Sequence, residues 1–351
     1  MLKLAIIFGG KSTEHDISIV SGTSIIYNLD KNKYRIFPIY LGLDGVFYKY
    51  SKKIENINPF KIGEHPTEIK PIKNIIKYLE KIDIVFPVLH GKYGEDGTIQ
   101  GMLELLGKKY VGCKVLASSI CMDKIYTKTI LRACNIEQAK SMYIKKESNN
   151  YIYIDYNFNK ELLTKNNLSN KVKKYLNYPV FIKPSNLGSS IGINKASNDN
   201  ELFEYIEEAF RYDTKVLIEE TIIGREVECA VFGNNKLITS CIGEVLSAES
   251  FYSYDSKYNN KESKTTIPAS LPKNTEKKIQ DIAKKAYLAC DCQGLSRIDF
   301  FIEKDTNRIV LNEINTMPGF TEISMYPKLM EQVGYNYSRL LDILIKLAID
   351  S

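Results

Sequence analysis

The sequence lacks any run of about 18 apolar residues, so it lacks the pattern of a membrane-spanning helix. The apolar stretch within residues 1–10 is too short for a secretory signal and has no small-residue cleavage site, so we expect it to form the first strand. The chain also lacks a basic block, because the lysines behind its net charge of +6 are scattered. This distribution weakly favours anionic ligands and argues against nucleic acid or a membrane as a partner.

Clustered cysteines are absent as well. The seven cysteines are odd in number, and Cys290 and Cys292 have one residue between them, which fits neither a zinc knuckle nor a redox pair. We expect reduced thiols and a cytoplasmic protein. With 351 residues, 44% of them hydrophobic and 26% charged, the chain is typical of a globular protein of two or three domains.

The first motif lacks the glycines of the common nucleotide fingerprints. Residues 4–8 predict a buried strand, residues 9–12 (GGKS) a turn, and residues 17–29 a helix, which together indicate the start of an α/β domain. A P-loop would need glycine where Ala5 stands, and Lys11 breaks a GxGxxG pattern.

Two loops that follow predicted strands carry candidate ligand-binding side chains. Glu14 follows the first strand, at the edge where open α/β sheets bind ligands, and its carboxylate can hold an ammonium group. An acid favoured by the helix dipole is an equal alternative. His90 opens a glycine-rich loop after the strand 82–89 and is either a core histidine or a functional one. Glu95 in the same loop is equally well interpreted as a structural residue or as a functional one.

A second glycine-rich loop follows Lys183. Residues 178–183 predict a strand, a loop containing Ser189 and Ser190 follows, and residues 192–196 predict a return strand. Backbone N–H groups and hydroxyls after a lysine suit the phosphates of a nucleotide, so this hairpin is a candidate phosphate lid. The alternative is an ordinary hairpin turn.

Three segments predict elements between these motifs and at the end of the chain. Residues 116–134 indicate one helix, residues 148–170 an irregular connection with one short helix, and residues 327–349 a closing helix. Residues 247–265 form a long aromatic stretch without periodicity, which in a compact domain is usually functional.

The strongest pattern is a predicted hairpin over residues 295–315, called here the acidic hairpin. Because residues two apart on a strand share a face, Asp299, Glu313 and Asn315 are expected on one face together with Arg297. Oxygen ligands without histidine or cysteine suit Mg²⁺, and the guanidinium can bind an anion that the metal also contacts. An exposed hairpin with ordinary surface charges is the alternative.

Seven stretches in this order resemble the ATP-grasp enzymes and, within them, the D-alanine–D-alanine ligase family. They are residues 9–18, 90–98, 122–124, 183–192, 251–258, 297–299 and 312–321. The resemblance covers essentially the whole chain and implies an α/β (α+β) ATP-grasp fold. An N-terminal Rossmann-like parallel-sheet domain (1–121), a central lid domain (122–213) and a C-terminal mixed-sheet domain (214–351) are expected.

The resemblance implies a cytoplasmic enzyme of peptidoglycan precursor synthesis. ATP phosphorylates the carboxylate of one D-alanine, and the amine of a second D-alanine attacks the D-alanyl phosphate. Glu14 is expected to bind the ammonium of the first D-alanine, near His90, and to form a closing link with Ser189 and Tyr258. Ser324 and Met325 are expected beside the second D-alanine.

The nucleotide and metal residues are implied in the same way. The residues expected around ATP are Lys124, Lys183, Ser190, Glu219, Ile222, Glu226 and Lys257. Asp299, Glu313 and Asn315 are expected to hold two Mg²⁺ or Mn²⁺ ions. Arg297 and the backbone N–H of Gly319 are expected to stabilise the oxyanion. Family members are commonly homodimers.

The sequence departs from the family pattern near the adenine and near the second substrate, and two alternative functions stay open. Glu220 and Thr221 replace a lysine and an aromatic residue beside the adenine, and Glu322 and Ile323 replace a Ser-His pair near the second substrate. The aromatic stretch has no histidine, unlike ligases that use D-lactate, and Met325 favours D-alanine over D-serine. A D-alanine–D-serine ligase is the first alternative. A catalytically inactive nucleotide-binding module is the second, although the four side chains of the acidic hairpin are intact.

Overall fold

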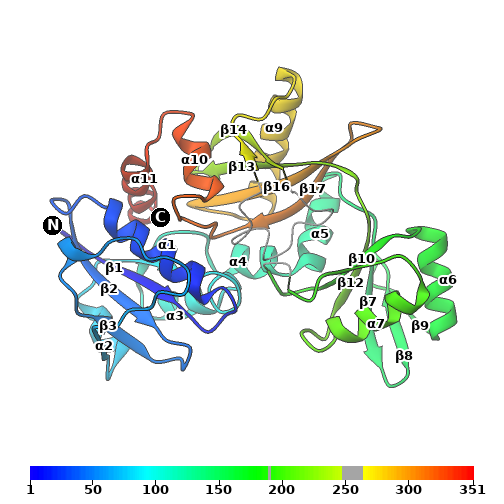
Figure 1. Cartoon of the computed structure of the whole chain (residues 1–351), viewed down its shortest axis with the longest axis horizontal. Coiled ribbons are helices and arrows are strands. Elements are labelled where there is room, and N and C mark those ends of the chain that lie inside the picture. The colour runs from blue at the N-terminus through cyan, green and yellow to red at the C-terminus, as the bar shows by residue number, and fades with distance from the viewer. Residues whose placement is uncertain (189–190, 247–263) are drawn as a thin grey trace.

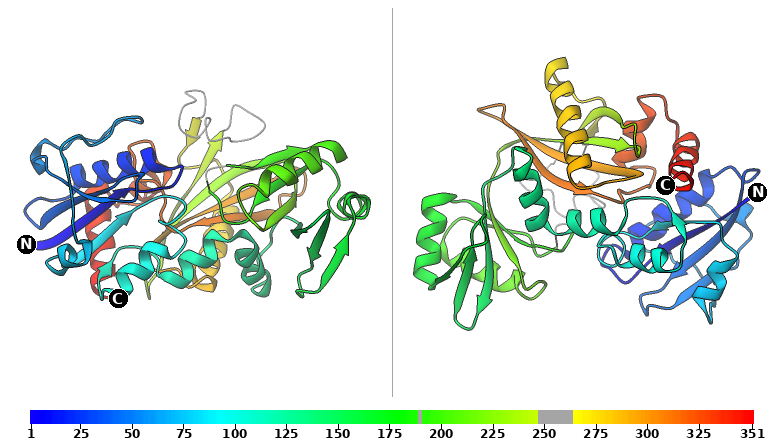
Figure 2. Two further views of the ribbon diagram at one scale, coloured as in Figure 1. Left: turned by 90° about the horizontal axis from the view of Figure 1, so that it is seen from below. Right: turned by 180° about the vertical axis from the view of Figure 1, so that it is seen from behind.

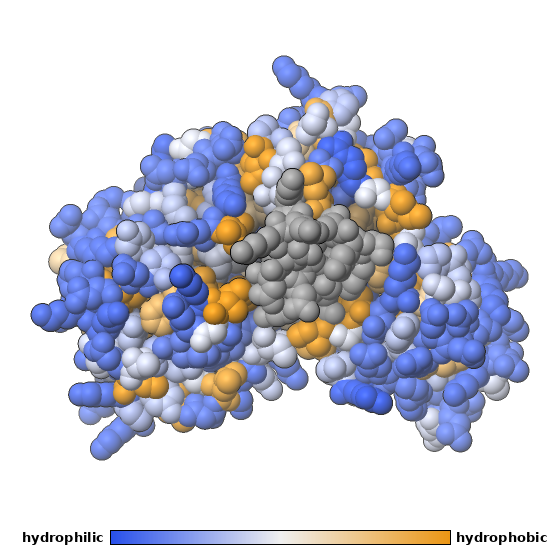
Figure 3. All heavy atoms as spheres, viewed as in Figure 1, coloured by the Kyte–Doolittle hydropathy of each residue, from blue (hydrophilic) through white to orange (hydrophobic). Residues whose placement is uncertain are grey.

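The computed structural model describes residues 1–188, 191–246 and 264–351, and the strands of these residues form three sheets that follow one another along the chain (Figure 1). The third sheet lies between the other two along the longest axis of the molecule (Figures 1 and 2). Hydrophilic side chains cover most of the outer parts of the face in Figure 3. No helix in the described part of the chain is both long and apolar enough to cross a bilayer.

The first sheet has the strand order β4-β3-β2-β1-β5-β6. Its strands are β1 (Leu2–Gly9), β2 (Tyr34–Leu41), β3 (Phe47–Tyr50), β4 (Ile69–Pro71), β5 (Ile84–Val88) and β6 (Lys109–Tyr110). Its helices are α1 (His15–Asn28), η1 (Ile54–Asn56), α2 (Ile75–Glu80) and α3 (Thr98–Leu105). The predicted parallel pairing is confirmed for β2, β1, β5 and β6, while β3 and β4 form an antiparallel edge.

The helix predicted over residues 116–134 is two helices. They are α4 (Val115–Met122) and α5 (Lys124–Ala133), and Asp123 between them has extended backbone. The Asp123 carboxylate accepts hydrogen bonds from the backbone N–H groups of Ile125 and Tyr126 and so caps α5. The single-helix prediction was wrong because apolar periodicity continues through the break.

The second sheet has the order β11-β10-β12-β7-β8-β9. Its strands are β7 (Ser141–Glu147), β8 (Asn150–Ile154), β9 (Lys160–Leu163), β10 (Val180–Pro184), β11 (Asn194–Ala196) and β12 (Val216–Glu220), and its helices are α6 (Lys165–Tyr175) and α7 (Asp199–Ala209). The predicted hairpin after residue 178 is confirmed as β10 and β11. The irregular connection predicted over 148–170 was wrong, because residues 150–154 and 160–163 form two strands, in which Tyr151, Ile154 and Leu163 are buried, although the expected short helix is present as α6.

The third sheet is antiparallel, with the order β15-β14-β13-β16-β17. Its strands are β13 (Gly224–Phe232), β14 (Ile238–Leu246), β15 (Lys264–Thr266), β16 (Leu295–Glu303) and β17 (Ile309–Asn315), and its helices are α9 (Lys273–Ala289) and α10 (Met325–Glu331). The last helix, α11 (Tyr337–Ile349), packs against β5 and β6 of the first sheet. The closing helix is interrupted, since Gly334 has a φ of +93° and Asn336 caps α11.

The cores show how these sheets are joined. One cluster of buried apolar residues runs from the first sheet to the third, with Phe86 packed edge-on against Phe320. The second sheet has its own cluster, which includes Ile144 and Ile182. Strand β12 belongs to this second sheet, although its five residues fall in the predicted third domain. The domain boundaries at 121/122 and 213/214 stay predictions.

Candidate active site

A cavity of about 160 Å³ is lined by residues from each of the three segments of the chain that carry the three sheets. It brings together eleven of the predicted site residues. They are Glu14, His90, Lys124, Glu226, Arg297, Asp299, Glu313, Asn315, Gly319, Ser324 and Met325. The loop that follows β10 reaches the same cavity through Leu187 and Gly188.

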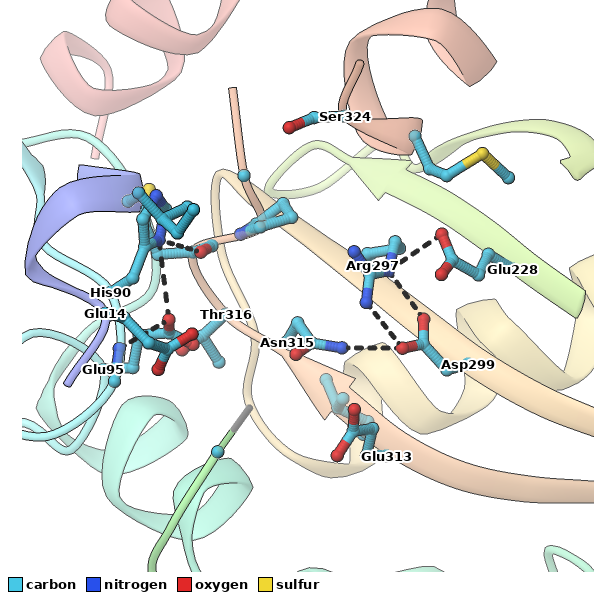
Figure 4. Close-up of a pocket in the computed structure, with 18 of the residues that line it drawn as sticks. Glu14, His90, Glu95, Glu228, Arg297, Asp299, Glu313, Asn315, Thr316 and Ser324 are labelled. Atoms are coloured by element: carbon cyan, nitrogen blue, oxygen red, sulfur yellow. Dashed lines mark hydrogen bonds and ion pairs between the residues drawn. The ribbon is translucent and has the colours of Figure 1, made fainter. Parts of the chain in front are cut away.

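The acidic hairpin forms one wall of this cavity (Figure 4). Asp299 on β16 lies opposite Glu313 on β17, and Arg297 lies opposite Asn315, so the predicted sharing of one face is confirmed. A register shift follows Asp299. The amide of Asn315 donates from Nδ2 to Oδ2 of Asp299 over 3.0 Å.

Arg297 is held by carboxylates on two strands. Its Nε and Nη2 each donate to one oxygen of Asp299 over 2.7 Å, and its Nε also lies 3.1 Å from Oε2 of Glu228. Burial alone would lower the pKa of Arg297, but Asp299 and Glu228 outweigh it and raise the pKa above its ordinary value. The guanidinium is therefore permanently charged beside the cavity.

Glu228 is a site residue that the sequence prediction missed. It lies on β13 directly opposite Asp299, is 5% exposed and lines the cavity. Glu226, two residues earlier on the same strand, lines the cavity too. That spacing of two was the available signal, because it places both carboxylates on one face.

His90 is both a buried histidine and a residue of the cavity wall. Its Nδ1 donates to the carbonyl oxygen of Met317 over 3.0 Å, and its Nε2 lies 3.0 Å from the hydroxyl of Ser21. Burial lowers the pKa of His90, but Glu95, whose Oε1 lies 3.7 Å from Nδ1, outweighs it, and the pKa is raised. Glu95 also accepts from the backbone N–H of Gly91.

The Glu14 carboxylate lies between two glycine-containing loops. A Cβ added to Gly91 would lie 2.3 Å from Oε2 of Glu14, and one added to Gly188 would lie 3.3 Å from the same atom. Glu14 thus reaches from the start of α1 toward the loop that follows β10. This position suits a carboxylate that holds an ammonium group inside the cavity.

Two lysines predicted near phosphates are the first residue of α5, Lys124, and a residue near the end of β10, Lys183. Lys124 is partly buried and donates from Nζ to the carbonyl oxygen of Leu187 over 2.5 Å, and the loss of solvent around it lowers the pKa of its ammonium group. Lys183 lies 2.5 Å from Oε2 of Glu219. Lys183, Glu219 and Ile222 do not line the cavity itself.

Glu219 is enclosed by two ammonium groups. Lys128, which the sequence prediction missed, lies 2.6 Å from its other oxygen, and Glu219 is only 4% exposed. Burial raises the pKa of this carboxyl, but Lys128 and Lys183 outweigh it and lower the pKa to about 2. The side chain of Glu220, next along β12, accepts instead from Arg308 and from the backbone N–H of Lys140.

The remaining predicted residues lie near the end of the hairpin or outside the described residues. The Ser324 hydroxyl accepts from the backbone N–H of Thr321 and precedes α10, and Met325 is buried beside it. The predicted site residues outside the described part of the chain are Ser189, Ser190, Lys257 and Tyr258.

Two groups of described side chains have ligand atoms that suit a cation. Asp299, Glu313 and Asn315 supply oxygen atoms, which fit a hard divalent cation such as Mg²⁺ or Mn²⁺. His15, Asp16 and His65 also place one ligand atom each within 4.8 Å of the others. Two of the three ligands in that group are imidazole nitrogens, which suit Mg²⁺ less well than oxygen atoms do. The acidic hairpin is therefore the better fit to such a cation.

Comparison of the sequence with known families gives two matches. Residues 3–113 match the family described as D-ala D-ala ligase N-terminus, and residues 149–346 match the family described as D-ala D-ala ligase C-terminus. A D-alanine–D-alanine ligase of Caldicellulosiruptor bescii is 45% identical, covering 99% of this chain and 95% of the relative. One of Clostridium acetobutylicum is also 45% identical, covering 99% and 97%.

Solved structures of D-alanine–D-alanine and D-Ala:D-Ser ligases are similar to this chain over nearly its whole length. A D-alanine–D-alanine ligase from Coxiella burnetii is 34% identical with a TM-score of 0.84, covering 99% of this chain and 94% of that one. A D-Ala:D-Ser ligase from Enterococcus faecalis is 38% identical with a TM-score of 0.83, covering 99% of both. A Bacillus anthracis D-alanine–D-alanine ligase complexed with ATP is 30% identical with a TM-score of 0.74, covering 100% and 98%.

Proposed function

Because the chain belongs to the D-alanine–D-alanine ligase family and has its ATP-grasp fold, we infer that it is an ATP-dependent ligase that joins two D-alanines. The product is D-alanyl-D-alanine, a precursor of peptidoglycan, and D-alanyl phosphate is the intermediate. One observation carries this inference: the Glu14 carboxylate, which is suited to bind an ammonium group, and the charged face of the acidic hairpin line a single cavity.

The first step must bring two anions together. A carboxylate oxygen of the first D-alanine attacks the γ-phosphorus of ATP, and the bond to ADP breaks. Glu14 holds the ammonium group of that D-alanine, and Arg297 supports the negative charge as it shifts during transfer. Asp299, Glu313 and Asn315 would hold two Mg²⁺ or Mn²⁺ ions, which when bound neutralise phosphate charge.

The second step forms the peptide bond. The amine of the second D-alanine attacks the acyl carbon of D-alanyl phosphate, and phosphate leaves with the electrons of the broken carbon–oxygen bond. Arg297 and the backbone N–H of Gly319 stabilise the oxyanion of the tetrahedral intermediate. Ser324 receives the carboxylate of the second D-alanine, with Met325 beside it. Ser189 and Tyr258 link with Glu14 to close the site.

The nucleotide lies between the second and third sheets in this proposal. Lys124, Lys183 and Ser190 contact the phosphates, and Lys257 also reaches the nucleotide. Ile222 and the backbone around Glu219 frame the adenine, because the Glu219 carboxylate is already paired with Lys128 and Lys183. Glu226 takes the ribose hydroxyls.

The location and assembly of the protein belong to the same proposal. A cytoplasmic location is supported by the seven cysteines, all of which are free thiols. The homodimer rests on the family resemblance alone. No nucleic acid or membrane partner is proposed.

The test is phosphate release from Mg-ATP with D-alanine alone, followed by competition with D-serine and identification of products by mass spectrometry. We expect turnover to D-alanyl-D-alanine with little diversion to the mixed dipeptide. Efficient formation of D-alanyl-D-serine would contradict the assignment of the second substrate. Nucleotide binding without turnover of either amino acid would contradict the ligase function.

A further inference from the structure

Arg297 bridges two strands of the third sheet. The guanidinium of Arg297 donates two hydrogen bonds to Asp299 on the same strand. The Nε atom of Arg297 also lies 3.1 Å from Oε2 of Glu228 on β13. Because Glu228 and Asp299 are directly opposite each other, their carboxylates flank the guanidinium on one face of the sheet (Figure 4).

Two demands on Asp299 conflict. Both of its oxygens accept hydrogen bonds from Arg297, and one also accepts from Asn315. The function proposed above gives the same oxygens to a divalent cation, which repels a guanidinium at close range. Arg297 must nevertheless stay at the cavity, because the developing negative charge forms there.

We propose that Glu228 is a positioning residue that retains Arg297 when the oxygens of Asp299 turn to a cation. This inference rests on the proposed function. Glu228 is buried, lines the same cavity and keeps contact with the guanidinium without using Asp299. A buried guanidinium that loses one carboxylate is strongly held by the other, because the alternative is an uncompensated buried charge.

Kinetics of Glu228→Gln and Glu228→Asp test this role. Glu228→Gln keeps the volume and removes the charge, so kcat should fall by about tenfold or more while KM for D-alanine changes little. Glu228→Asp keeps the charge but shortens the reach, so its kcat should lie between those of Glu228→Gln and wild type. Thermal unfolding checks that each variant is folded.

Glu244→Gln is the matched control. Glu244 lies on β14 of the same sheet, is 8% exposed and forms two hydrogen bonds of 2.6 Å with Arg225. It is opposite Val227, so it belongs to the other face, and it does not line the cavity. This variant removes the charge of another buried glutamate that is paired with an arginine, and its kcat should stay near wild type.

Mn²⁺ binding, measured by electron paramagnetic resonance, gives a readout that does not require turnover. Glu228→Gln should weaken Mn²⁺ binding, because Arg297 then competes more strongly for Asp299. In an Arg297→Gln background the same change should have little effect. Equal weakening in both backgrounds would mean that Glu228 acts directly on the cation and would overturn the proposal.

The outcomes separate the two proposals. A wild-type protein that does not ligate D-alanine contradicts the proposed function. A wild-type protein that ligates D-alanine, with Glu228→Gln equally active, overturns only the positioning role of Glu228.

Discussion

At the scale of single residues, the charge of Glu313 matters more than its volume. Glu313 lies opposite Asp299 at the cavity, and its replacement by glutamine keeps the shape while removing one negative charge. We expect Glu313→Gln to lower kcat by about a hundredfold or more. Steady-state kinetics and a thermal unfolding curve close to that of wild type would show this; wild-type activity would refute the metal assignment.

Glu219 makes a prediction about pH. Because Lys128 and Lys183 hold the pKa of Glu219 at about 2, below the value of an unfolded glutamate, the ionised form stabilises the folded state. This stabilisation is complete above the unfolded pKa of about 4.3 and is lost as the pH falls toward 2. We expect a contribution of about 3 kcal/mol at neutral pH.

Urea unfolding of wild type and Glu219→Gln between pH 7 and pH 2.5 measures this contribution. The wild type should be the more stable at neutral pH, and the difference should shrink as the pH falls below about 4.5. A difference that stays constant over this range would show that the two ammonium groups do not hold the carboxylate ionised.

Much of the site chemistry could be predicted at the residue scale, because alternation along one strand places side chains without knowledge of the fold. Asp299 and Glu313 are the clearest case. The same alternation places Glu228 on the face of Glu226, but the charged partners of Glu228 and Lys128 could not be found in this way. Each acts across a pairing between segments distant in sequence, and such pairings depend on tertiary structure.

At the scale of elements, the break between α4 and α5 places the Asp123 carboxylate in contact with the start of α5, the loop that follows β10 and the residue that precedes β12. Asp123 caps α5, accepts from the hydroxyl of Ser185 over 2.5 Å and forms an ion pair with Lys215. Lys124, the next residue, donates its backbone N–H to the carbonyl of Ser185. The cap thus fixes the start of α5 against the loop that follows β10.

We therefore expect Asp123→Ala to lower the free energy of unfolding by roughly 1–2 kcal/mol and to raise KM for ATP. Urea unfolding and kinetics at varied ATP measure the two effects. Asn198→Ala is the control, since Asn198 caps α7 through the backbone N–H of Glu201 away from the cavity. An unchanged KM for ATP in Asp123→Ala would separate the cap from nucleotide binding.

The longer strands β1, β5, β16 and β17 could be predicted well, because apolar runs and turn residues bound them, whereas the short strands β3, β4, β6 and β15 were not predicted. Helix ends were harder to predict. The apolar pattern passes through Asp123 and through Gly334, so periodicity alone joined helices that local capping separates. The strands β8 and β9 were missed because few of their side chains are buried, and buried apolar residues give most of the signal.

At the scale of the whole molecule, Arg308 ties the acidic hairpin to the second sheet. It lies between β16 and β17, and its Nη atoms lie 3.0 Å from Glu137 and 3.1 Å from Glu220. Glu137 precedes β7 and Glu220 ends β12, so these contacts hold both chain connections to the second sheet. Glu303, 3.2 Å away, completes the group.

We expect Arg308→Gln to raise KM for ATP while KM for the first D-alanine stays close to wild type, because the proposed nucleotide site lies between the second and third sheets. The stability cost should be small, roughly 1 kcal/mol, since the group is partly exposed. Lys277→Gln, which removes an exposed pair with Asp281 on α9, is the control. Equal KM values for ATP in wild type and Arg308→Gln would contradict this linkage.

The position of Gly91 restricts which residues can replace it during evolution. Its φ is +70°, and the space where a Cβ would stand is filled by the Glu14 carboxylate. Every missense mutation of this codon introduces at least that one carbon, and so both strains the backbone and displaces the group proposed to hold the first substrate. Lineages that carry this enzyme should therefore keep glycine at this position even where the surrounding surface diverges.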